Sequence, residues 1–83
     1  MMQESIREDY HGKILSIVKD YLGPAADRFT NRQINLHIKK DPQDLQRSDI
    51  PMLAIRIRSG LMVLTRDEAV VDEAFRRVVS LGD

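Results

Sequence analysis

The segment 33–40, QINLHIKK, admits two interpretations that lead to different folds. Apolar Ile34, Leu36 and Ile38 alternate with polar residues, which is the period of a half-buried strand. The preceding residues, PAADRFTNR, are typical of the opening of a helix, and no glycine, proline or turn cluster separates the two stretches. The first stop signal is KKDP at 39–42, and basic residues suit a helix C-terminus. We therefore predict one helix over about 24–39.

The segment 52–65, MLAIRIRSGLMVLT, presents the same choice. As strands, its two halves would be joined at Ser59 and Gly60 in a hairpin. Together with 33–40 they would form a small α+β domain with a three-stranded antiparallel sheet, which stays open as the alternative fold.

A helix explains this region with a longer pattern and a proper start signal. Ser48 or Asp49 would cap the helix, and Pro51 would lie in its first turn. The apolar residues then recur at spacings of three and four, and we predict a helix over about 49–64. The predicted stripe consists of Ile50, Leu53, Ala54, Ile57, Leu61 and Leu64.

The first helix is predicted over about 5–22. Ser5 and Glu8 have the spacing of a capping box, and apolar residues follow at helical intervals. Gly12 is a mild weakness inside this helix. The glycine-proline pair at 23–24 ends it, because glycine suits the position after a helix and proline suits the first turn of the next.

The last helix is predicted over about 66–81. Thr65 and Glu68 form the second capping-box pattern, and Gly82 marks the end. The apolar stripe of this helix consists of Val71, Ala74, Phe75, Val78 and Leu81.

These elements predict an all-α fold, a compact four-helix domain with short connections that spans 1–83. The connection 41–49 is expected to hold a single helical turn with Leu45 beneath the bundle. A chain of 83 residues makes one domain with a thin core, which a partner or second subunit would help to cover.

Composition excludes several classes of function. Basic and acidic residues balance at 13 each, whereas a free-standing nucleic-acid-binding domain usually has a basic excess. No cysteine is present, so disulfides and thiolate metal sites are excluded. The N-terminal MMQESIREDY lacks the apolar core of a signal peptide, and we expect a cytoplasmic protein without a membrane span.

No set of residues predicts catalysis, a metal or a cofactor. Glu8 and His11 have the Glu-x-x-His spacing of di-metal helical bundles, but such a site needs a second copy of the motif. The other histidine, His37, has an isoleucine in the corresponding position. No serine has the surroundings of a nucleophile, and the four glycines stand too far apart for a phosphate loop. We predict a protein that is not an enzyme and binds neither metal nor cofactor.

Arginines are the notable polar residues of the second half of the chain. A surface that binds anions or nucleic acid could be built from Arg56, Arg58, Arg66 and Arg77. Acidic residues nearby in sequence and the helix C-terminus also account for several of them. Nucleic-acid binding is therefore the alternative function.

Apolar residues outside the main stripes predict an interaction surface. The predicted helices 24–39 and 49–64 carry apolar side chains on more than one side, and methionine suits adaptable binding surfaces. The predicted interface residues are Ile34, Ile38, Met52, Ile55, Met62 and Val63. The sequence thus favours a small regulatory or adaptor module that acts through protein-protein interaction and self-associates as a homodimer.

Overall fold

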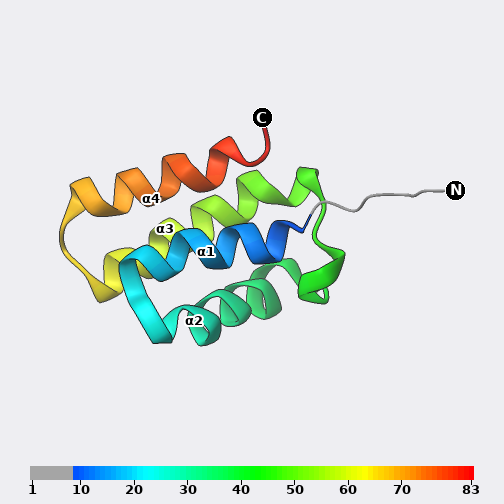
Figure 1. The fold of residues 1–83 in the computed structure, drawn as a ribbon, viewed down its shortest axis with the longest axis horizontal. Coiled ribbons are helices and arrows are strands. Elements are labelled where there is room, and N and C mark those ends of the chain that lie inside the picture. The colour runs from blue at the N-terminus through cyan, green and yellow to red at the C-terminus, as the bar shows by residue number, and fades with distance from the viewer. Residues whose placement is uncertain (1–8) are drawn as a thin grey trace, which may run out of the picture.

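The computed structural model describes residues 9–83, which fold into four α-helices joined by short turns (Figure 1). The α-helices are α1 (Tyr10–Leu22), α2 (Ala26–Gln33), α3 (Ile50–Leu64) and α4 (Glu68–Ser80). Shorter helical turns occupy Gly23–Ala25, Ile34–Ile38, Pro42–Asp44 and Arg47–Asp49. No strand occurs within 9–83, so the all-α prediction is confirmed and the three-stranded alternative is wrong.

The segment 33–40 continues α2 and widens before it ends. Its turn Ile34–Ile38 is a π-helix, and the amide of Lys39 donates to the carbonyl of Ile34 at 2.8 Å. Lys39 has a left-handed φ of 61°, which ends the helix. Ile34 is buried and Ile38 packs against the core, whereas Leu36 is 53% exposed. The alternation that resembles a strand thus comes from one exposed leucine between two inward isoleucines.

The buried face of α2 differs from the one that the apolar pattern suggested. Ala26, Thr30 and Ile34 follow one another at four-residue spacing, and all three are fully buried. By spacing, the apolar residues Ala25, Phe29 and Leu36 share one side of the predicted helix, but Phe29 is only half-buried and the other two are exposed. Ile34 therefore belongs to the core rather than to a second surface. The expectation was wrong because Thr30 is polar and does not contribute to an apolar pattern.

The start of α1 explains a glycine that the sequence marked as a weakness. The predicted capping box at 5–8 lies outside the described residues. Within them, Asp9 caps the helix, and its Oδ1 accepts a hydrogen bond from the amide of Gly12 at 2.9 Å. A Cβ atom at position 12 would overlap the Asp9 carboxylate, so this cap favours glycine. Gly23 ends α1 with a φ of 58°, as the sequence predicted.

The last helix begins two residues later than predicted. Asp67 is its N-cap, and its Oδ1 accepts from the amides of Ala69 at 3.1 Å and Val70 at 3.4 Å. The Thr65 hydroxyl instead accepts from the amide of Asp67 at 3.3 Å. The threonine therefore supports the turn before the cap, because the aspartate already occupies the capping position. The inward stripe of α4 is as predicted, with Val71, Ala74 and Val78 buried and Phe75 and Leu81 packed against the core.

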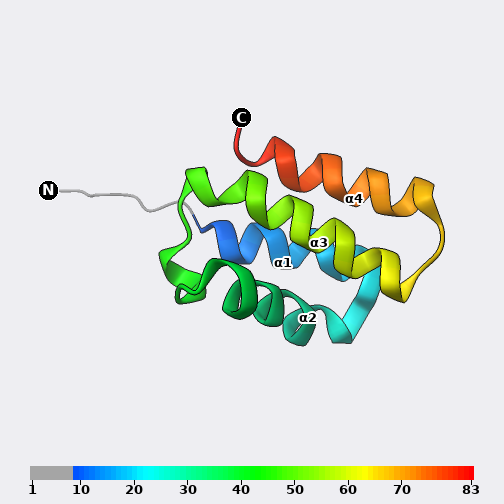
Figure 2. The same cartoon turned by 180° about the vertical axis from the view of Figure 1, so that it is seen from behind.

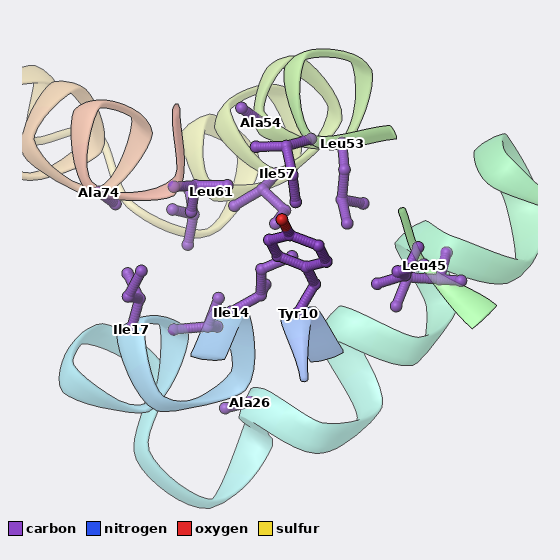
Figure 3. Packing of buried hydrophobic residues seen from close by; sticks show 14 of the residues in the cluster. Tyr10, Ile14, Ile17, Ala26, Leu45, Leu53, Ala54, Ile57, Leu61 and Ala74 are labelled. Atoms are coloured by element: carbon purple, nitrogen blue, oxygen red, sulfur yellow. The ribbon is translucent and has the colours of Figure 1, made fainter. Parts of the chain in front are cut away.

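The helices form a bundle in which α1 and α3 lie on opposite sides and α2 and α4 lie at the edges (Figures 1 and 2). Side chains from α1 and α3 meet in the core, where the Tyr10 ring points toward Leu53 and Ile57 (Figure 3). In Figure 2, α3 lies in front between α4 and α2, so the side of α3 that faces the viewer points away from the bundle. This position of α3 decides where the molecule exposes apolar surface.

The connection between α2 and α3 is held at both ends. Leu45 is buried in the core, as predicted. Lys40 Nζ lies 2.9 Å from Asp49 Oδ2, and the same oxygen accepts from the amide of Gln46 at 2.9 Å. Burial of Asp49 alone would raise its pKa, but the hydrogen bonds from Lys40 and Gln46 and the charge of Lys40 hold this pKa below its usual value. The start of α3 is thereby fixed to the end of α2.

Candidate interaction surface on α3

The inner side of α3 is the centre of the hydrophobic core. Its predicted stripe is confirmed except at its last member. The five fully buried residues are Ile50, Leu53, Ala54, Ile57 and Leu61. Leu64 is 58% exposed, because it is the last residue of α3, where the chain turns toward α4.

The opposite side of α3 is also apolar, and no other part of the described chain covers it. We call it the outer face of α3, and it consists of Met52, Ile55, Ser59, Met62 and Val63. Residues spaced by three and four positions lie on one side of an α-helix, so these five side chains form a continuous strip. Ile55 is 51% exposed and Val63 is 83% exposed, while the small Ser59 lies at the middle of the strip.

Four of the six predicted interface residues lie on this outer face, and two lie elsewhere. Ile34 has no exposed surface, so it cannot contact a second chain in this fold. Ile38 is half-buried and packs against the core at the end of the π-turn. Both point inward because the buried stripe of α2 runs through Ala26 and Thr30, as described above. The candidate surface is thus a single helix face rather than a combination of two.

A groove borders the outer face on the side of α4. Ile55 and Ser59 of α3 line it together with Asp72, Phe75 and Arg76 of α4. Arg58 completes the lining, with its Nη2 atom 3.2 Å from Asp72 Oδ1. The Arg58 guanidinium also lies 5.9 Å from the centre of the Phe75 ring, within the range of a cation-π contact. One arginine therefore joins the two helices and covers an aromatic ring that lines the groove.

On its other side, α3 meets α2 at a glycine. A Cβ atom at Gly60 would lie 2.7 Å from the Phe29 ring, closer than such atoms pack. Gly60 therefore lets the ring lie directly against the α3 backbone. In the alternative hairpin Gly60 would have lain in the turn, whereas in the predicted and observed helix it is a mid-helix contact point. Arg56 lies four residues before Gly60, on the same flank of the helix, and its side chain is exposed.

The structure does not gather the four predicted arginines into one patch. Arg56, Arg58 and Arg66 lie around the outer face of α3, but Arg77 lies between α4 and α1. The Arg77 guanidinium forms an ion pair with Asp20 at 2.8 Å, donates to the Tyr21 hydroxyl at 3.0 Å and lies over the Tyr21 ring.

Arg77 belongs to a network that joins the two helices. The Tyr21 hydroxyl donates in turn to Glu73 at 2.8 Å. Hydrogen bonds to Tyr21 and Asp20 raise the pKa of Arg77. The charged guanidinium of Arg77 therefore links α4 to α1.

Sequence reasoning missed Arg76 as a member of the groove. Adjacent residues of an α-helix point about 100° apart, so Arg76 and Arg77 project to different sides of α4. Arg76 lines the groove beside α3, whereas Arg77 reaches α1. Arg76 shares one side of α4 with Asp72, four residues earlier, but only tertiary packing brings that side beside α3.

The two histidines occupy unrelated places. The Nε2 atom of His11 lies 2.9 Å from the Asn31 side-chain oxygen and links α1 to α2. Glu8, its proposed partner in a metal motif, lies outside the described residues. His37 is exposed on the π-turn. Residues 9–83 contain no group of three side chains that could hold a metal ion.

Comparison with known proteins adds no family or relative. No protein-family model, curated protein or solved structure matches the chain. Among residues 9–83, no helix combines the length and the apolar character that crossing a membrane requires.

Proposed function

We propose that this protein is a small non-enzymatic helical module, regulatory or adaptor in role, that acts through protein-protein interaction. The observation that supports the proposal is the outer face of α3. Single exposed apolar residues are common on soluble proteins and need no explanation. Here four large apolar side chains and one serine follow each other along one helix, and the helix is already apolar on its buried side.

The shape of the region suits a helix as the bound element. The spacing of Met52, Ile55, Ser59 and Met62 is three, four and three residues, which is the pattern of a seam between two packed helices. The groove along α4 extends this seam sideways over Phe75. A partner helix would thus contact α3 and α4 together, as in helix-in-groove recognition.

Site-specific photo-crosslinking in the cells that make the protein tests this proposal. A benzophenone amino acid at Ser59 lies at the centre of the outer face, and the same group at Ser16, an exposed position on α1, is the matched control. We expect an adduct with a protein from position 59 and not from position 16. The adduct should disappear when Met62→Arg is added. Equal labelling from both positions, or none from position 59, would show that this face is not an interaction site.

Self-association is the form of this function that the sequence predicts. Sedimentation equilibrium over a wide concentration range tests it directly. If two copies meet at α3, the substitutions Ile55→Arg and Met62→Arg should each weaken association while circular dichroism shows unchanged helix content. A dimer that persists in both variants would place the contact elsewhere.

Nucleic-acid binding is the second candidate and has less support. Arg77, one of its four predicted residues, is engaged by Asp20 and Tyr21. Binding to DNA or RNA should be steeply dependent on salt, and its absence at low salt would dispose of this candidate.

A further inference from the structure

Four arginines border the outer face of α3, with one carboxylate, Asp72, beside two of them in the groove toward α4. Arg56 lies on the flank toward α2, Arg58 and Arg76 line the groove toward α4, and Arg66 follows the C-terminal end of the helix. From position 50 to position 66 the sequence contains three arginines and no aspartate or glutamate. The chain as a whole has no net charge, so this positive border is a local feature.

Three of these four arginines have no ion-pair partner within the described chain. Arg58 is paired with Asp72. Arg56, Arg66 and Arg76 are exposed, and none of them forms an ion pair with another residue of 9–83. An apolar strip bordered by unpaired arginines is complementary to an apolar strip that is bordered by acidic side chains.

We propose that the outer face of α3 binds an amphipathic helix whose apolar stripe is flanked by aspartate and glutamate. The proposal rests on the interaction function above and specifies the chemistry of the partner. The apolar side chains of such a helix would pack between Met52, Ile55 and Met62, and Ser59 gives room for close approach. Its carboxylates would face Arg56 on one flank and Arg76 on the other.

A second copy of this chain is a poorer occupant of the face. Two outer faces brought together would place the arginine border of one copy against that of the other, and like charges at an interface oppose association. Nucleic acid is also poorly matched. The outer face offers no hydrogen-bonding side chain except Ser59, and the aromatic ring beside it, Phe75 in the groove, is already covered by Arg58.

A set of synthetic helical peptides tests the proposed partner chemistry. The peptides have the 15-residue length of α3, carry side-chain staples to hold the helix, and present several different combinations of Leu, Ile and Met at heptad spacing. Each combination is made with Glu, with Gln or with Lys at the flanking positions. Fluorescence anisotropy with the full chain gives the affinity of each peptide.

We expect the Glu peptides to bind most tightly and the Lys peptides most weakly. The affinities of the Glu and Lys peptides should differ roughly tenfold at low salt, because two or three attractive pairs with arginine become repulsive. This difference should shrink as salt is added. Arg56→Glu and Arg76→Glu should each reduce the preference for Glu peptides. Arg28→Glu is the matched control, because Arg28 lies on α2 beside Asn31, on the side toward α1, and should leave the preference unchanged.

The outcomes separate this inference from the function on which it rests. Equal binding of all three peptide types would retain the docking face but overturn the acidic partner, and failure of all peptides would overturn it as well. A stable dimer that Ile55→Arg dissociates would also overturn it, with a second copy as the occupant. Displacement of the Glu peptides by a single-stranded or duplex oligonucleotide would assign the face to nucleic acid instead. The crosslinking result at position 59 decides the interaction function independently of these measurements.

Discussion

The inner and outer faces of α3 are both built from large apolar side chains, but only the inner face is packed. Leu53 and Ile57 are fully enclosed by the other helices, whereas Ile55, between them in sequence, is about half exposed. Composition alone would not separate the two faces. The difference comes from position, because α2 and α4 approach α3 from its flanks and leave one side open (Figure 2). An apolar residue at helical spacing therefore indicates contact, but the contact can be with another molecule.

The largest expected effect comes from truncating one residue on each face. Leu53→Ala should lower the free energy of unfolding by about 2–5 kcal/mol, since it leaves a cavity in the core. Ile55→Ala should change it by less than about 0.5 kcal/mol, because the side chain already faces solvent. Urea denaturation of both variants measures the difference. Similar losses in the two variants would mean that the outer face is packed in the isolated chain.

The next largest effect tests the boundary between the faces at Gly60. Alanine is a better helix former than glycine by about 1 kcal/mol, so Gly60→Ala would stabilise a free helix. Here the added methyl group meets the Phe29 ring, and overpacking of this kind costs about 1–3 kcal/mol. We expect a net loss of stability in thermal denaturation. The same substitution in a Phe29→Leu background should recover part of the loss, and a stabilised single variant would contradict the close contact.

A smaller effect, of opposite sign, is expected within the core. The Thr30 hydroxyl is fully buried and has no hydrogen-bond partner within the described chain. Thr30→Val replaces this hydroxyl with a methyl group of similar shape and should raise stability by about 1 kcal/mol. Thr30→Ser is the control, because it keeps the hydroxyl, removes the methyl group and should destabilise. If valine destabilised as well, the hydroxyl would have a partner that stabilises the fold.

The smallest effect concerns the pair that fixes the start of α3. The pKa of Asp49 is lower in the folded chain than its ordinary value of 3.8. Its contribution to stability is therefore complete above that ordinary pKa and is lost as the pH falls through the lowered one. Asp49→Asn should cost less than about 1 kcal/mol at neutral pH, since the pair is partly exposed. Denaturation at neutral and strongly acidic pH measures the difference in unfolding free energy between this variant and the original chain. We expect the difference to disappear in acid, and a difference that stays constant would contradict the ion pair.

Local rules predicted α3 and α4 well because their inward residues are apolar. The stripe from Ile50 to Leu61 needed only spacing, and Pro51 marked its start. The same rules failed on α2, where Thr30 occupies a core position and a π-turn changes the direction of the following residues. No rule based on a regular α-helix anticipates a wider turn. This turn packs against α3.

The candidate surface was predictable in part, because helical spacing also identifies residues that lie outside the buried stripe. Met52, Ile55, Met62 and Val63 lie outside the inner stripe of a helix, and that can be deduced from spacing alone. Spacing alone could not show which arginines border these residues. Arg76 comes from α4 and joins the groove only through tertiary packing. Helix geometry alone points Arg76 and Arg77 to different sides of α4, but only tertiary packing brings Asp20 of α1 to Arg77.

The π-turn at Ile34–Ile38 has a consequence for how the chain could change in length. A π-turn holds one residue more than an α-helical turn, and it is equivalent to a single-residue insertion in a regular helix. The exposed Leu36 lies within it, and the two inward isoleucines lie on either side. A chain that lacked Leu36 could close this turn to an ordinary α-helix and keep both isoleucines facing the core. This is therefore a place where the bundle can lose one residue without shifting any helix that surrounds it.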